Sequence, residues 1–149
     1  GVRHIREIER ILATVPLNPS ALPCVEALRE RGVRTAILTC GIDLLANRIA
    51  AVLGVDACWA NSLQTTKDGL LTGNGIPNVT LENKHRYLRQ LAECFNTPIE
   101  QTAYIGDSAF DIPLFQTVGF AITTSPELQS FANFYLPFEN LHKLPELLP

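Results

Sequence analysis

The feature that most constrains the fold is a regular alternation of short apolar segments with helical patterns. Segments rich in aliphatic and β-branched residues are predicted strands, and patterns with helical periodicity separate them. Strands joined by helices of this length connect by right-handed crossovers. The sequence therefore predicts an α/β fold with a mostly parallel sheet, interrupted by one hairpin at 63–73. The predicted strands cover 33–39, 55–60, 102–105, 120–123 and 134–136, and the main helices cover 2–15, 43–53 and 82–95.

The composition fits one globular domain and limits its partners. A chain of 149 residues can bury a sizeable core. The net charge of −3 offers no basic surface for nucleic acid or for an anionic membrane. The apolar runs are too short to span a bilayer, and the first residues do not resemble a signal peptide. The four cysteines form no C-x-x-C pair, so we expect free thiols and a cytoplasmic protein.

Two aspartates follow the predicted strand at 102–105. Asp107 comes directly after Gly106, and Asp111 lies four residues later, before a short predicted helix. Ligands of open α/β sheets bind beyond the carboxyl ends of the strands, and carboxylates are suitable ligands for Mg²⁺. The alternative is ordinary turn and helix-capping chemistry, for which Asp next to Gly is common.

A second polar group follows the predicted strand at 33–39. Thr39 ends that strand, and Cys40 and Gly41 lead into a helix. Backbone N–H groups at such a turn can bind an anion, although Thr39 could equally just finish the strand. The spacing argues against a cysteine phosphatase, because the Cys-x5-Arg loop would need Arg where the chain has Ala46.

Lys84 stands at the start of the predicted helix 82–95. A lysine in a first turn opposes the helix dipole. This position indicates either a cation directed at a phosphate or carboxylate, or an ordinary solvated surface lysine.

In their order along the chain, these three groups resemble the haloacid dehalogenase superfamily of phosphatases, in its phosphoserine-phosphatase-like branch. The resemblance covers essentially the whole chain, and it rests on segments 39–46, 76–84 and 106–111. The last segment usually reads G-D-G-x-N-D in that branch. Here Ser108 replaces the second glycine and Phe110 replaces the asparagine.

The resemblance implies a Rossmann-like three-layer sandwich that hydrolyses a small phosphorylated metabolite, such as phosphoserine, through an aspartyl-phosphate. It implies Mg²⁺ as the cofactor. The implied residues are Asp107 for the metal, Asp111 and Ser108 in support, and Thr39, Cys40, Gly41 and Lys84 for the phosphate, with Lys84 and Thr39 as catalytic members.

The family carries its nucleophile in a D-x-D motif on a strand that precedes all of these segments, and no Asp-x-Asp occurs here. By the resemblance, 1–16 is a remnant of a helical cap and 17–149 is the core domain, with the first strand and most of the cap missing. The strands that end near Thr39 and Asp107 would then expose free edges, which a partner chain or a dimer could complete.

Two hypotheses remain open on the sequence. The chain is most of a Mg²⁺-dependent phosphomonoesterase, inactive alone because it lacks the nucleophile, or it is a non-catalytic phosphate-binding or regulatory relative. A phospho-acceptor receiver domain is disfavoured, because it needs an acidic pair after the first strand and a lysine after the last.

Overall fold

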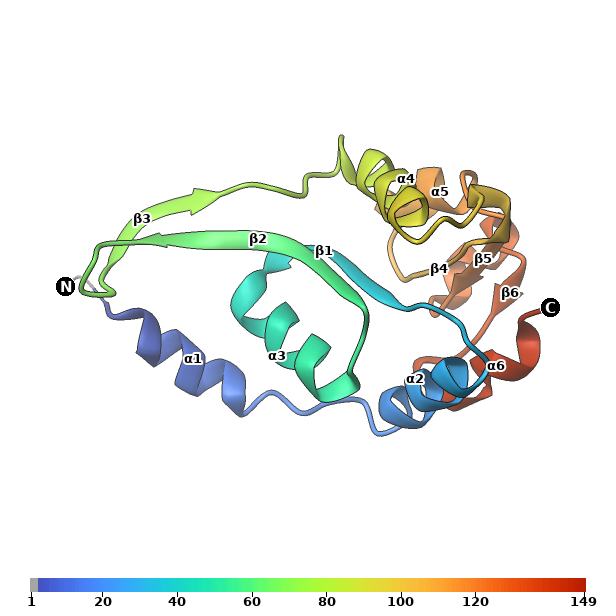
Figure 1. Cartoon of the computed structure of the whole chain (residues 1–149), viewed down its shortest axis with the longest axis horizontal. Helices are drawn as coiled ribbons and strands as arrows, with labels where there is room; N and C mark the ends of the chain where they lie inside the picture. Colours follow the sequence, from blue (N-terminus) through green and yellow to red (C-terminus); the bar gives the residue numbers. More distant parts are fainter. Residues whose placement is uncertain (1–2) are drawn as a thin grey trace.

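The computed structural model describes residues 3–149, and within them the strands form two three-stranded sheets (Figure 1). In the first sheet, β1 (Ala36–Ile42) pairs in parallel with β2 (Ala57–Thr65), and β2 pairs antiparallel with β3 (Leu71–Ile76). In the second, β4 (Ala103–Gly106), β5 (Phe120–Thr123) and β6 (Phe134–Tyr135) run parallel. β1 and β4 are therefore outer strands, and each has one edge that no described strand pairs.

Helices lie on both sides of the sheets. Figure 1 shows α1, α2, α3 and α6 on one side and α4 and α5 on the other. α3 connects β1 to β2, and α4 follows the hairpin and precedes β4. The helices are α1 (Ile5–Ala13), α2 (Ala21–Glu30), α3 (Asp43–Leu53), α4 (Lys84–Cys94), α5 (Ile112–Phe115) and α6 (Leu144–Leu147), with 3-10 helices at Ile99–Gln101, Ala109–Asp111, Pro126–Phe131 and Phe138–Lys143.

The core consists of two clusters that meet at β5. Side chains alternate between the two faces of a strand, so Ala121 joins one cluster and Ile122 the other. The cluster on the α4 side also receives Leu38 from β1, so the two sheets share one helical layer. The first cluster contains Leu88, Tyr104, Leu114, Phe115, Ala121 and Leu128, and the second contains Cys24, Leu28, Ile122, Leu136 and Leu144.

The predicted α/β fold with parallel strand pairs is confirmed, although the described strands do not form one continuous sheet. The helix predicted at 43–53 has the same bounds, and it ends at Gly54 in the left-handed conformation, with φ 66°. The hairpin is also confirmed. The strand predicted at 33–39 begins later, at Ala36, because the Thr35 N–H donates to the Asp56 side chain at 2.8 Å instead of to a neighbouring strand. That strand also extends to Ile42.

α1 contacts both the hairpin and α3. The Ile5 N–H donates to the Gly69 carbonyl at 2.9 Å. The Arg48 guanidinium donates to the carbonyls of Leu12 and Val15 at 3.0 and 2.9 Å, which satisfies backbone groups at the C-terminal end of α1. The assignment of 1–16 to a cap remnant remains a prediction, and residues 1–2 lie outside the described residues.

Two structural observations concern expectations that were drawn from the composition. All four cysteines are free thiols, as expected from their spacing. Across residues 3–149, no helix has both the length and the apolar character needed to cross a membrane.

Candidate functional site

The segment predicted to bind an anion bulges out of the first sheet. Leu38 pairs with Trp59 and Ile42 pairs with Asn61, so three residues of β1 face a single residue of β2. Bulges of this kind release backbone groups from the strand ladder and are frequent beside active sites. The released residues are Thr39, Cys40 and Gly41, which precede Ile42, the N-cap residue of α3.

Within the bulge, the Gly41 N–H donates to Thr39 Oγ1 at 2.9 Å. Cys40 and Gly41 are exposed, while Thr39 is half-buried. A Cβ at position 41 would lie 3.2 Å from Thr39 Oγ1, so glycine lets the turn close tightly. The predicted hydroxyl and amide are therefore adjacent to each other and to the start of a helix.

Asn61, which the sequence reasoning missed, connects this bulge to the segment that leads to Lys84. Its Nδ2 donates to the Cys40 carbonyl at 2.9 Å and to the Val79 carbonyl at 2.8 Å. Its Oδ1 accepts from the N–H groups of Asn78 and Val79, both at 2.7 Å. The signal available in the sequence was an asparagine directly after the apolar strand predicted at 55–60.

Lys84 is the first residue of α4. A reciprocal turn precedes it, in which the Thr80 N–H donates to Asn83 Oδ1 at 2.8 Å and the Asn83 N–H donates to Thr80 Oγ1 at 3.3 Å. The Lys84 side chain is only 14 % exposed, and its Nζ lies 3.0 Å from Asp111 Oδ1. Lys84 is therefore directed at a carboxylate, and the solvated surface alternative is wrong.

Asp111 is buried and accepts donors on both carboxylate oxygens. Oδ1 accepts from Lys84 Nζ at 3.0 Å and from the Tyr104 hydroxyl at 2.7 Å. Oδ2 accepts from the N–H groups of Asp107 and Ser108, each at 3.1 Å, and from Ser108 Oγ at 3.3 Å. A carboxylate has about four lone-pair sites, so these donors occupy its capacity. Asp111 thus orients Lys84 and Ser108.

The close approach of Asp111 to the strand end requires glycine at position 106. A Cβ at Gly106 would lie 2.6 Å from the Cβ, Cγ and Oδ2 of Asp111. Burial acts to raise the pKa of Asp111, but the hydrogen bonds from Tyr104 and Lys84, with a further one from Ser108, outweigh it and lower the pKa below its ordinary value. The carboxyl group therefore stays ionised beside Lys84.

Asp107 differs from Asp111 in its surroundings. Its carboxylate is exposed, and no hydrogen bond or ion pair from the described part of the chain reaches it. Phe110, which stands where the resembling motif has asparagine, is 65 % exposed. Of the two aspartates, Asp107 is the one whose oxygens are available to a ligand.

The residues fit one part of a Mg²⁺ site. Mg²⁺ is commonly held by one or two carboxylates together with waters and substrate phosphate. Asp107 can supply one such carboxylate, whereas residues 3–149 contain no group of three His, Cys, Asp or Glu side chains that could hold a metal alone. Further ligands must come from water, substrate or another segment.

The structure therefore brings Lys84, Ser108, Asp107 and Asp111 together. The bulge lies at the carboxyl end of β1, in the first sheet, and Asn61 connects it to the segment that leads to Lys84.

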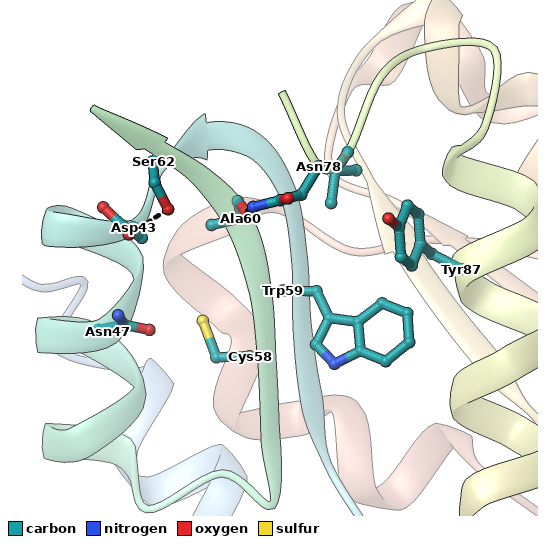
Figure 2. A pocket seen from close by; sticks show the side chains of 9 residues that line it. Asp43, Asn47, Cys58, Trp59, Ala60, Ser62, Asn78 and Tyr87 are labelled. Atoms are coloured by element: carbon teal, nitrogen blue, oxygen red, sulfur yellow. Dashed lines mark hydrogen bonds between the residues drawn. The ribbon is translucent and has the colours of Figure 1, made fainter. Parts of the chain in front are cut away.

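A separate pocket of about 330 Å³ lies at the edge of β2. Figure 2 shows Asp43, Asn47 and Cys58 on the α3 side of β2, with Trp59 and Tyr87 on the α4 side. None of the predicted site residues lines this pocket. It is distinct from the candidate site.

Comparison with known proteins finds relatives over most of the chain. A family model described as haloacid dehalogenase-like hydrolase matches residues 2–116. A phosphoserine phosphatase of Idiomarina loihiensis is 34% identical over 138 residues, which cover 91% of this chain and 62% of that protein. A phosphoserine phosphatase of Methanocaldococcus jannaschii is 30% identical over 143 residues, which cover 94% and 67%. The chain thus spans about two thirds of the length of these relatives.

Solved structures show the same similarity. A phosphoserine phosphatase in apo form has a TM-score of 0.89 and 26% identity, covering 99% of this chain and 75% of that one. A substrate-bound phosphoserine phosphatase complex has a TM-score of 0.88 and 26% identity, covering 99% and 71%.

Proposed function

The chain belongs to the haloacid dehalogenase-like hydrolase family, in its phosphoserine-phosphatase-like branch, and from this premise we propose that it forms most of a Mg²⁺-dependent phosphomonoesterase site. The observation that carries the proposal is the buried Lys84–Asp111 pair, 3.0 Å long, beside the free carboxylate of Asp107. A fixed cation next to an available metal ligand is the arrangement needed to bind and neutralise a phosphoryl group.

The bulge at the end of β1 would bind the phosphate oxygens. Thr39 supplies a hydroxyl, and the backbone N–H groups of Cys40 and Gly41 lie at the start of α3, where the helix dipole favours an anion. The Gly41 N–H now donates to Thr39 Oγ1 at 2.9 Å. Phosphate binding would exchange this internal bond for bonds to phosphate oxygens, at little net cost in hydrogen bonds.

Lys84 would neutralise charge that develops on the phosphoryl group. Because Asp111 holds the ammonium through Oδ1, the cation is in place before substrate arrives. Asp107 would hold Mg²⁺, which when bound polarises the phosphate and neutralises part of its charge. Ser108 would keep Asp111 in position by donating to Oδ2.

The nucleophile would come from a segment outside residues 1–149. Within the described strands, β1 and β4 each leave one edge unpaired, and Leu38 of β1 and Tyr104 of β4 pack in one cluster on α4. An extended segment between these two edges would pair with both and bring its own side chains to their carboxyl ends. An aspartate there would attack phosphorus, release the alcohol and form an aspartyl-phosphate, which water would hydrolyse. The segment would belong to the same polypeptide or to a partner chain.

The substrate would be a small phosphate monoester, with phosphoserine as the first candidate. This choice is supported by the relatives named phosphoserine phosphatase and by the substrate-bound structure with the same fold. No residue described here selects the serine part of the molecule.

The absence of Asp-x-Asp supports a second candidate, a non-catalytic phosphate-binding or regulatory module. One assay separates the two candidates. Hydrolysis of phosphoserine and of p-nitrophenyl phosphate is measured with Mg²⁺ and with EDTA, for residues 1–149 alone and for the complete gene product. We expect Mg²⁺-dependent turnover by the complete product and none by the 149 residues. A complete product that lacks activity on both esters would favour the regulatory module.

The role of Lys84 has a matched control in the chain. Lys84→Gln should abolish turnover by the complete product, while Lys67→Gln should not change it, because Lys67 is exposed in the hairpin turn. Turnover by residues 1–149 alone would overturn the proposal that the nucleophile lies outside them.

A further inference from the structure

Tyr104 joins the hydrophobic core to the Lys84–Asp111 pair. It is 9% exposed, and its ring packs in the cluster with Leu88 and Phe115, the Phe115 ring centroid lying 6.0 Å away. Its hydroxyl donates to Asp111 Oδ1 at 2.7 Å. Lys84 Nζ lies 5.5 Å from the centroid of the Tyr104 ring, so the same residue contacts both members of the ion pair.

The hydroxyl limits where the Lys84 ammonium can lie. A carboxylate oxygen offers two lone-pair directions. On Oδ1, the Tyr104 hydroxyl occupies one of them and Lys84 Nζ occupies the other. Without the hydroxyl, the ammonium could move between the two directions.

The ring has a complementary effect. The face of a tyrosine ring attracts a cation within about 6 Å of its centroid. Burial, together with the bond to Asp111, raises the pKa of Tyr104 above its ordinary value, so the hydroxyl remains a donor throughout the physiological range. The donor and the ring therefore act on Lys84 at the same time.

We propose that Tyr104 is a positioning residue, which fixes the direction of the Lys84 ammonium through Asp111 and through its own ring face. This inference deepens the proposed function and rests on it for any effect on catalysis. Tyr104 is not a catalytic residue, because it acts on the phosphoryl group only through Lys84.

The test compares Tyr104→Phe with Tyr87→Phe. The first variant keeps the ring and the core packing and removes only the hydroxyl. The second removes a hydroxyl from a ring that stacks edge-on against Trp59 at 4.6 Å, outside the candidate site. In the complete, active protein we expect Tyr104→Phe to lower kcat on the order of tenfold, with KM within about twofold of wild type. Tyr87→Phe should leave both constants unchanged.

A second measurement does not depend on activity. The ¹H–¹⁵N signal of the Lys84 ammonium, recorded on the 149-residue chain, should be observable in the wild type, since the group is largely shielded from water. It should be lost or broadened in Tyr104→Phe and retained in Tyr87→Phe.

A purely structural role would lower the melting temperature of Tyr104→Phe and leave kcat and the Lys84 signal unchanged, which would overturn the inference. Wild-type protein without phosphomonoesterase activity would overturn the proposed function, and the Lys84 signal would still decide whether Tyr104 positions the ammonium.

Discussion

Replacing Asp111 with asparagine should destabilise the fold strongly, although the two side chains have nearly the same shape. Every contact of the Asp111 carboxylate is with a donor. Oδ1 accepts from Lys84 and Tyr104, and Oδ2 accepts from Asp107 N–H, Ser108 N–H and Ser108 Oγ. An asparagine must place its NH₂ group at one of these two positions. In one orientation of the amide the NH₂ group faces two donors, and in the other it faces three.

The magnitude follows from the burial of the pair. The Asp111 side chain is 5% exposed and that of Lys84 is 14% exposed, so water cannot replace the lost anion. Removing one partner of a buried ion pair costs about 3–5 kcal/mol. We therefore expect Asp111→Asn to lower the free energy of unfolding by about 3–5 kcal/mol. Asp111→Ala should lower the free energy of unfolding by a similar amount, because the asparagine amide restores few of the interactions that the carboxylate makes with its donors.

The measurement is urea unfolding followed by circular dichroism, with one slope fitted to all variants. Asp43→Asn is the matched control. The Asp43 carboxylate is half-buried and accepts from Ser62 Oγ at 2.7 Å, a bond that an amide oxygen can also accept. We expect this control to cost about 1 kcal/mol or less. An Asp111→Asn variant within about 1 kcal/mol of wild type would refute the reasoning that the carboxylate is saturated by donors.

Three further outcomes follow from the structure. Gly106→Ala should lower the melting temperature and displace Asp111 in a crystal structure, because the added Cβ would lie 2.6 Å from its carboxylate. Asn61→Ala should cost about 2–4 kcal/mol in urea unfolding, because four hydrogen bonds to backbone groups are lost at once. Burial raises the pKa of Cys24 from 9.0 to about 11, so the stability from its neutral thiol is complete below pH 9 and is lost as the pH rises toward 11. That loss of stability is at most about 3 kcal/mol, and it should be absent from Cys24→Ala. In the same way, iodoacetamide at pH 8 should modify the exposed Cys40 well before the buried Cys24.

Local signals explain what the sequence could predict. The helix at 43–53 was predicted with its correct bounds, because Gly54 follows it and adopts the left-handed conformation that ends a helix. The position of Lys84 in a first turn raised the hypothesis of a directed cation but left the solvated alternative open, and the contact with Asp111 decides between them. The information that ends the helix, by contrast, lies within a few residues of it.

Contacts between distant segments could not be predicted in the same way. The bulge at 39–41 depends on the register between β1 and β2, which is a tertiary property. Asp111 was expected only as a supporting carboxylate, and the tertiary structure, which places Lys84 Nζ 3.0 Å from Asp111 Oδ1, identifies Lys84 as its partner. Tyr104 reads in the sequence as an ordinary strand residue, because nothing local shows that its hydroxyl reaches Asp111.

The candidate site has two halves on different sheets, namely the bulge at 39–41 of β1 and the Lys84–Asp111 network beside β4. Their relative position does not depend on strand pairing between β1 and β4. Leu38 of β1 and Tyr104 of β4 pack in one cluster with Leu88 of α4. Asn61 connects the Cys40 carbonyl to the segment that begins α4. Apolar packing and these hydrogen bonds hold both halves, and in the proposed function a strand that enters between β1 and β4 would gain backbone hydrogen bonds on two edges. In the proposed function, a phosphate-binding bulge and the lysine–aspartate network would therefore be ordered before the segment that supplies the nucleophile is in place.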